Sequence, residues 1–200
     1  MIVKVMSIIS SRQGFLTLAA LYLLLLAGCG QIPLGAPSAS FENIQEGRAS
    51  GTAPVAVGDF KLDPKLSPDV DKGLIVRSHI VSSPIDGSFA QYLKQTLITD
   101  LHAAGLYNGA SQITLSGSLT ESMLEVPINT SKARLGAHFV LTRKGGKTIY
   151  EKDLKVESTW PSALFGAEAI PMGINQYTSL YHKLVGKLLD DPDYRRANPK

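Results

Sequence analysis

The sequence has 200 residues, of which 44% are hydrophobic and 18% are charged, and its formal net charge is +3. This length and apolar content are typical of a globular protein with one hydrophobic core. Lysine and arginine are scattered along the chain, so the charge gives no basis for nucleic-acid binding. Cys29 is the only cysteine, which excludes an internal disulfide.

Residues 1–28 have the pattern of a secretory signal peptide. Lys4 and Arg12 precede the apolar run 15–27, and no acidic residue lies in this part of the chain. The run is shorter than the about 20 residues that a membrane-spanning helix needs, and small residues follow it. We therefore expect residues 1–28 to be removed from the mature protein, which lowers its net charge by two.

The tetrapeptide Leu26-Ala27-Gly28-Cys29 resembles the lipobox of bacterial lipoproteins at all four positions. The resemblance implies that the Cys29 thiol is lipidated, that the chain is cut before it, and that the new amino group is acylated. Each buried CH₂ contributes about 0.8 kcal/mol, so two or three acyl chains form a lasting membrane anchor. Gly30 follows the cysteine, and the sorting rule of enterobacterial lipoproteins then favours the outer membrane. The alternative is that Cys29 is an idle small residue of an ordinary leader or anchor.

Residues 29–53 are rich in glycine, alanine, serine and proline and contain few large apolar side chains. Such a composition predicts a flexible tether, because it buries too little surface to offset its ordering entropy. A coil of this length spans roughly 25–30 Å, which would hold a folded domain clear of the lipid headgroups. We expect residues 54–200 to form that single domain.

The first half of the domain contains two predicted strands and one predicted helix. Apolar residues alternate with small or polar ones in segment 55–60, and a second β segment, 74–81, ends at a serine-proline turn. From 89 to 104, apolar residues recur every three or four positions, which predicts an amphipathic helix. Gly105 is placed to end this helix in the left-handed conformation.

The second half contains three predicted strands and a last helix. The strands are expected at 113–119, 135–141 and 150–156, and the last two flank Gly145-Gly146, which predicts an antiparallel hairpin. Pro171 is placed to start the final helix. The order β-β-α-β-β-β-α predicts an α+β fold, a two-layer sandwich in which two amphipathic helices cover one face of a mostly antiparallel sheet.

The usual motifs of catalysis and metal binding are missing from the sequence. Segment 144–148 ends like a phosphate-binding loop, but Leu141 stands where that motif needs its first glycine. No Gly-x-Ser-x-Gly is present, and the four histidines lie too far apart for ligand spacing. We therefore expect no enzyme activity, no metal and no cofactor, although a triad assembled from distant residues stays open.

One segment between the last strand and the last helix, 160–167, is apolar and contains a glycine. Exposed apolar loops often mark contact surfaces, so Trp160, Leu164 and Phe165 are candidate contacts for a partner. The alternative is that these three side chains fold back over the end of the core.

Taken together, the chain resembles a group of small envelope lipoproteins. The group comprises the YajG-type lipoproteins, the ABC-type transport auxiliary lipoproteins and, more distantly, the lipopolysaccharide-assembly lipoprotein. Besides the lipobox, the resemblance rests on the Val55-Ala56-Val57 strand, the helix end 101–105, the strand 113–119, the Gly-Gly hairpin and the helix end 189–192. It implies a domain of two helices and one sheet that binds a partner or lipid and has no catalytic residues.

These observations predict a protein held in the outer membrane through lipidated Cys29, with its domain in the periplasm. We expect a non-catalytic accessory protein of an envelope transport or assembly system that binds another envelope protein and no nucleic acid. Two alternatives stay open, a carrier or sensor of an apolar ligand and a hydrolase acting on the cell wall or on lipids.

Overall fold

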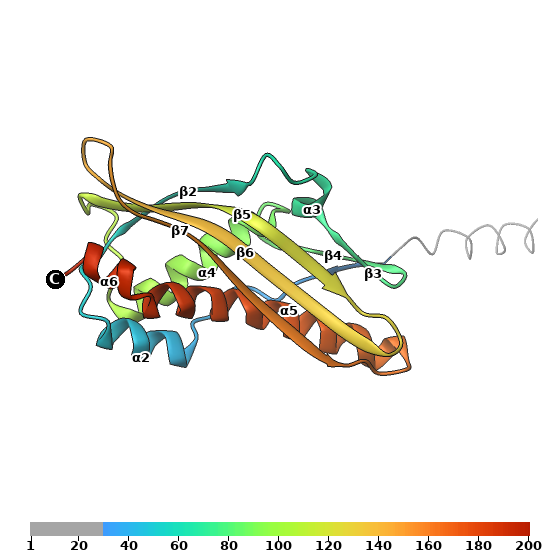
Figure 1. Ribbon diagram of the computed structural model, residues 1–200. Helices are drawn as coiled ribbons and strands as arrows, with labels where there is room; N and C mark the ends of the chain where they lie inside the picture. Colours follow the sequence, from blue (N-terminus) through green and yellow to red (C-terminus); the bar gives the residue numbers. More distant parts are fainter. Residues whose placement is uncertain (1–29) are drawn as a thin grey trace, which may run out of the picture. The chain divides into compact units, whose positions relative to one another are not determined.

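The computed structural model describes residues 30–200, and residues 31–200 form one compact unit (Figure 1). The predicted signal peptide and Cys29 lie outside the described residues. The strands are β1 (Gln31–Pro33), β2 (Ala56–Leu62), β3 (Leu74–Val76), β4 (His79–Ser82), β5 (Ile113–Glu125), β6 (Thr130–Arg143) and β7 (Lys147–Pro161). The helices are α2 (Phe41–Ala49), α3 (Asp69–Lys72), α4 (Phe89–Ala104), α5 (Gly166–Asp190) and α6 (Pro192–Ala197).

The main sheet has the strand order β2-β5-β6-β7. Strands β5, β6 and β7 form an antiparallel meander, whereas β2 lies parallel to β5 at the edge. Gly145 and Gly146 form the turn between β6 and β7 with φ angles of 97° and 84°. These angles suit glycine, which has no Cβ to clash at positive φ, and they confirm the predicted hairpin.

Helices α4 and α5 cover one face of this sheet, α4 against β2 and α5 against β6 and β7 (Figure 1). The Ser88 side chain accepts a hydrogen bond from the Gln91 N–H and so caps the start of α4. At the other end Gly105 has a φ of 76°, and the Leu106 N–H donates to the Leu101 carbonyl at 2.8 Å. The predicted α+β sandwich and its first helix are confirmed.

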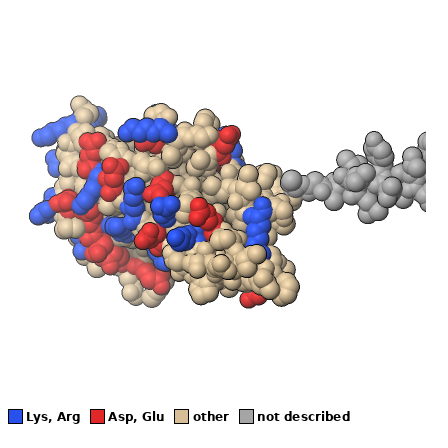
Figure 2. Space-filling model, turned by 45° about the vertical axis from the view of Figure 1, so that its right-hand side comes forward, with Lys and Arg blue, Asp and Glu red and all other residues tan. Residues whose placement is uncertain are grey.

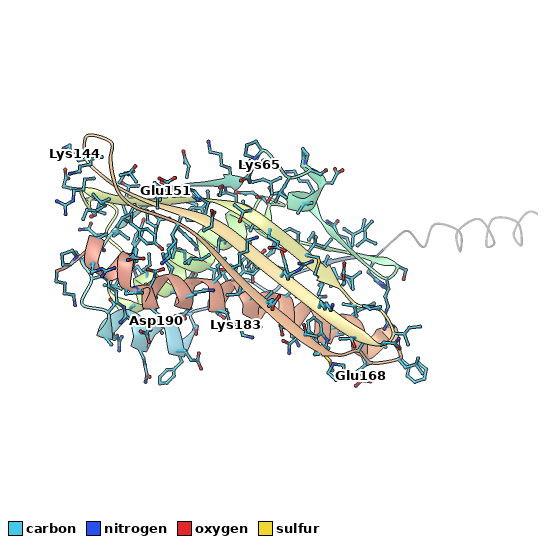
Figure 3. All side chains as sticks on the ribbon, viewed as in Figure 1. Lys65, Lys144, Glu151, Glu168, Lys183 and Asp190 are labelled. Atoms are coloured by element: carbon cyan, nitrogen blue, oxygen red, sulfur yellow. The ribbon has the colours of Figure 1, made fainter. Side chains whose placement is uncertain are left out.

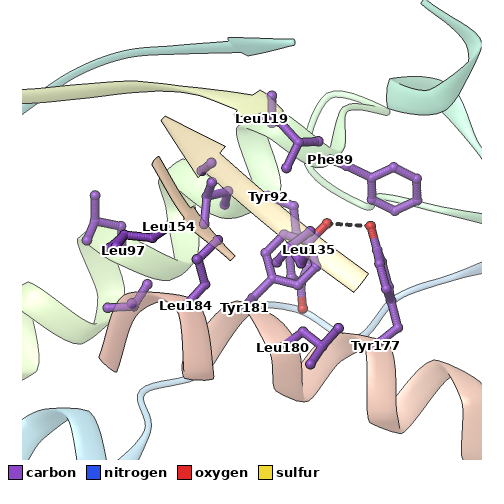
Figure 4. Close-up of a cluster of buried hydrophobic side chains, with 14 of the residues drawn as sticks. Phe89, Tyr92, Leu97, Leu119, Leu135, Leu154, Tyr177, Leu180, Tyr181 and Leu184 are labelled. Carbon is purple, nitrogen blue, oxygen red and sulfur yellow. Dashed lines mark hydrogen bonds between the residues drawn. The ribbon is translucent and has the colours of Figure 1, made fainter. Parts of the chain in front are cut away.

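Three tyrosines lie at the centre of the core between the helices and the sheet (Figure 4). The Tyr177 hydroxyl lies 2.9 Å from that of Tyr181 and 2.7 Å from the Ser122 hydroxyl, while Tyr92 packs edge-on against Tyr181. Burial raises the pKa of Tyr92 to about 12 and also raises the pKa of Tyr177 and Tyr181. The hydroxyls are therefore neutral at physiological pH, and hydrogen bonds between Tyr177, Tyr181 and Ser122 satisfy these buried polar groups inside the core.

The prediction of a flexible tether over residues 29–53 is wrong for most of that segment. Strand β1 pairs in parallel with β4, and Leu34 after it is only 3% exposed. Helix α2 packs against α4 and α5. The segment is poor in apolar residues, yet the rest of the domain supplies a sheet edge and hydrogen-bond acceptors that offset its ordering entropy. The compact unit therefore starts at Gln31 instead of residue 54.

Two further boundaries differ from the prediction. The β segment 74–81 divides into β3 and β4 around a tight turn, where Arg77 has a φ of 54°. Glycine usually occupies such a conformation, so the arginine gave no signal for a turn. Helix α5 begins at Gly166, and Pro171 lies inside it instead of starting it. A proline this close to the start of a helix removes only one hydrogen bond, and the packed core of α5 tolerates that loss.

Candidate binding groove

An apolar groove lies between β1, the turn that joins β3 to β4, and the first half of α5. Its volume is about 580 Å³. Ile32 of β1, Ala167, Ile170 and Ile174 of α5 contribute apolar surface. Ala167, Ile170 and Ile174 follow the three- and four-residue spacing that brings side chains to one face of a helix.

Arg77 frames this groove by joining three segments that are distant in sequence. Its Nε donates to the Val126 carbonyl at 3.0 Å, and its Nη2 donates to those of Pro127 at 3.4 Å and Ala163 at 2.8 Å. Its Nη1 donates to the Leu164 carbonyl at 3.1 Å. A guanidinium holds its N–H groups in a rigid fork, so one side chain fixes the β3–β4 turn, the β5–β6 loop and the β7–α5 loop together.

The structure separates the three predicted contact residues. Leu164 and Phe165 are 62% and 72% exposed in the loop before α5, whereas Trp160 is only 8% exposed. Trp160 lies an even number of residues from the inward-facing Leu154 of β7, so its side chain also points into the core. Trp160 is therefore not an accessible contact, while Leu164 and Phe165 stay candidates.

More exposed apolar side chains lie near the loop that carries Leu164 and Phe165. Ile75 and Ile80 face each other across β3 and β4, and Ile128 lies in the β5–β6 loop that Arg77 also holds. We call the region formed by β1, the β3–β4 hairpin, the β5–β6 loop and the β7–α5 loop the apolar end. Figure 2 shows that charged side chains gather over the other part of the visible face.

We call the opposite region, formed by α2, α6 and the β6–β7 turn, the charged end. Lys144 in that turn and Glu168 at the start of α5 lie at opposite ends of the domain (Figure 3). Lys152 of β7 pairs with Asp191 at 2.7 Å, and Arg195 of α6 pairs with Glu46 of α2. The two ends therefore differ in their surface chemistry as well as in the elements that form them.

Polar side chains also come together outside the groove. Asp100 of α4 is fully buried and accepts hydrogen bonds from the Ser40 backbone N–H at 2.8 Å and from Asn43 Nδ2 at 2.6 Å. His182 Nδ1 lies 3.5 Å from the same carboxylate, and no hydrogen bond forms between them. Asp100 therefore holds the start of α2 on the domain, a role that no local sequence motif indicates.

On the uncovered face of the sheet, His138 lies between Asp153 at 3.0 Å and Glu151 at 3.1 Å. In the groove, the Ser78 hydroxyl lies 3.3 Å from His79 Nδ1. Within residues 30–200, no group of three histidine, cysteine or carboxylate side chains is arranged to hold a metal ion. In the same part of the chain, no helix has the length and hydropathy needed to cross a membrane.

No protein-family model matches this chain, and no curated protein matches it in sequence. Several solved structures show a partial similarity to this chain. A candidate lipoprotein from Caulobacter crescentus is 20% identical, with a TM-score of 0.40 over 48% of this chain and 74% of its own. A hypothetical protein from Chlamydia trachomatis is 10% identical, with a TM-score of 0.44 over 74% of this chain and 99% of its own.

A lipoprotein from Neisseria meningitidis is 13% identical to this chain. Its TM-score is 0.29, over 64% of this chain and 99% of its own. Identities this low carry no residue roles from one chain to another.

Proposed function

We propose that this protein is a lipid-anchored, non-catalytic lipoprotein of the bacterial outer membrane, with its domain in the periplasm. In this proposal it serves an envelope transport or assembly system by binding an apolar segment of another envelope protein. The lipobox at Cys29 supports the anchor, and the groove between β1, the β3–β4 turn and α5 is the observation that carries the binding role.

The groove has the physical properties of a binding site. Its volume of about 580 Å³ lies in the range of ligand pockets, and its walls are mostly apolar with a few polar groups, Ser78, His79 and Asn175, that can orient a partner. Arg77 fixes the loops beside it, so little conformational entropy is lost on binding. Ile170 and Ile174 on one face of α5 offer apolar surface that a partner segment can cover.

The absence of enzyme activity is part of the proposal. A nucleophile needs a base, and the base needs a third group that orients it. Ser78 and His79 are neighbours in sequence, and within the described residues the His79 ring hydrogen-bonds only to Ser78. The rings of His138 and His182 are both next to carboxylates that serve ion pairing or helix attachment. These arrangements favour a binding role over hydrolysis.

A carrier or sensor of an apolar ligand is the second candidate, and the mainly apolar lining of the groove favours it. The two candidates differ in what the groove holds. A carrier returns bound lipid when it is extracted from membranes, whereas an accessory protein returns a second polypeptide.

Crosslinking in cells tests both candidates. A photoreactive amino acid replaces Ala167 in the groove, and a control variant carries it in place of Lys144 at the opposite end. We expect a protein adduct from position 167 and none from position 144. Lipid that stays bound to the domain after extraction from the membrane would favour the carrier, and the absence of both protein and lipid at position 167 would contradict the binding role.

The anchor has a separate test. In the Cys29→Ser variant we expect an uncleaved precursor that incorporates no radiolabelled palmitate, while the parent protein is cleaved and labelled. Normal processing and membrane retention of the variant would overturn the anchor.

A further inference from the structure

The folded domain starts almost at the lipidated residue. Gln31, the first residue of β1, is two residues after Cys29, and two extended residues span at most about 7 Å. The domain fixes the chain that follows β1, because the Leu34 N–H donates to the Ser82 carbonyl at 2.8 Å. The Tyr92 hydroxyl also donates to the Gly35 carbonyl at 2.8 Å. Residues 31–35 are therefore part of the folded domain and cannot act as a flexible tether between the domain and Cys29.

Strand pairing determines which part of the domain lies beside that starting point. Gln31 pairs with Ile80 of β4, and Ile80 pairs with Ile75 of β3, so β1 begins beside two exposed isoleucines. The hydrogen bonds of Arg77 hold the loops with Ile128 and Phe165 in the same region. Chain connectivity thus places the apolar end next to the membrane.

The chemistry of this end suits a lipid surface. Large exposed apolar side chains gain free energy at the boundary between headgroups and acyl chains. The arginine in this region, Arg77, donates to main-chain carbonyls, and among the described residues no carboxylate forms an ion pair with it. Glu168 in the first turn of α5 is an exposed carboxylate at the same end, so the apolar contacts must outweigh its repulsion from anionic lipids.

Phe165 gives a further indication. It occupies the N-cap position of α5, with φ and ψ of −85° and 134°, and forms no capping hydrogen bond. Serine or aspartate at this position would stabilise the helix. The exposed phenylalanine ring adds little to the core and is accessible to a surface outside the domain.

We propose that the apolar end rests on the bilayer that holds the acyl chains of Cys29, with Leu164 and Phe165 inserted at the headgroup boundary. The proposal goes beyond the function above by stating how the domain is oriented, and it rests on the lipidation of Cys29. The groove then lies beside the lipid surface, and the charged end with the β6–β7 turn faces away from it. The anchor keeps the local lipid concentration high, so a few apolar contacts are enough for stable docking.

Fluorescence quenching tests this orientation. The lipidated protein is reconstituted in vesicles of phosphatidylethanolamine and phosphatidylglycerol that carry a quencher on the lipid headgroups. Because the Cys29 thiol is lipidated, a single dye can be attached at Ile128→Cys in one variant and at Lys144→Cys in another. We expect strong quenching at position 128 and little at position 144. Equal quenching at both positions would overturn the proposal.

A matched pair of substitutions identifies the contact. The double substitution Leu164→Ser and Phe165→Ser is expected to lower the docked fraction, measured at position 128, by about tenfold. Phe41→Ser removes a similarly exposed ring from α2 at the charged end and is expected to leave docking unchanged. Equal effects of the two changes would contradict the assigned contact.

Flotation of the vesicles separates failure of docking from failure of the anchor. Protein that floats with the vesicles but shows equal quenching at positions 128 and 144 keeps its anchor and lacks docking. Protein that does not float has no anchor, and that result overturns both proposals.

Discussion

Charged side chains hold both ends of the domain together, but the groups that they contact differ. At the apolar end, the Arg77 guanidinium donates to main-chain carbonyls of two loops. At the charged end, carboxylates accept: Asp100 holds the start of α2, and Asp191 accepts from Lys152 and from the start of α6.

The two kinds of group respond differently to pH. Carboxylates lose their charge in acid, whereas a guanidinium stays charged at every ordinary pH and carbonyls do not titrate. At the charged end, the ion pair between Asp191 and Lys152 therefore depends on pH.

The largest expected effect is at Asp100. Asp100→Ala removes the acceptor of the Ser40 N–H and one of the two acceptors of Asn43 Nδ2, so we expect the free energy of unfolding to fall by about 3 kcal/mol. Urea denaturation measures the change, and hydrogen exchange should increase in α2 more than at the apolar end. The exposed Asp153→Ala is the control, with a change within about 0.5 kcal/mol. A fully stable Asp100→Ala protein would show that packing alone holds α2.

Gly117 lies in the sheet that joins the two ends, and its substitution should weaken both. A Cβ at this position would lie 2.6 Å from the His138 carbonyl oxygen and 2.9 Å from a ring carbon of Phe60. Gly117→Val is therefore expected to lower the free energy of unfolding by about 2.5 kcal/mol. Gly35→Ala is the control, because a Cβ there has open space. An unchanged melting temperature for Gly117→Val would contradict this close packing.

At the apolar end, Arg77 holds two loops in the way that Asp100 holds α2 at the charged end. Arg77→Ala leaves its carbonyl partners to water, and we expect a loss of about 2 kcal/mol, with faster exchange in the β5–β6 and β7–α5 loops. Arg77→Lys should restore little of this, because an ammonium lacks the planar fork. Arg196→Ala, at an exposed position of α6, should change stability by no more than about 0.5 kcal/mol. If Arg77→Lys were as stable as the parent, charge rather than geometry would hold the loops.

The pH dependence of the free energy of unfolding should show a smaller effect, which comes from the charged end. Burial by itself raises the pKa of Asp191, but hydrogen bonds from Lys152 and from the backbone N–H groups of Asp193 and Tyr194 outweigh it and lower the pKa below 3.8. A lowered pKa contributes stability that is present above the ordinary value and is lost as the pH falls through the folded value. We expect the parent to lose more stability than Asp191→Asn between pH 5 and pH 3, measured by urea denaturation. Parallel curves for the two proteins would contradict this role.

The smallest effect on stability is expected at the loop before α5. Phe165→Ser removes an exposed ring and supplies an N-cap, so the free energy of unfolding should stay the same or rise by about 0.5 kcal/mol. Thermal unfolding of the domain in detergent measures this. A clear loss of stability would show that Phe165 belongs to the core of the domain instead of a contact surface.

Local signals in the sequence predicted the elements that depend mainly on their own residues. The helix 89–104 carries its apolar spacing and its terminal glycine within the same segment, and Gly145-Gly146 supplies the positive φ angles of the hairpin. Asp191-Pro192 ends α5 and caps α6 as a local pair. Local residues also predict the lipid anchor at Cys29, which lies outside the described residues.

Contacts between residues that are distant in sequence determine the order of segment 31–50 and the arrangement of the apolar end. Segment 31–50 is ordered because β4 offers it an edge and Asp100 accepts hydrogen bonds from its backbone and from Asn43. Arg77 shapes the apolar end by donating to main-chain carbonyls far along the chain. Every residue has such a carbonyl, so the sequence does not indicate which ones accept from Arg77. Local sequence patterns could therefore predict α4 and the main sheet, whereas only the tertiary structure showed that the folded domain begins at Gln31, two residues after Cys29.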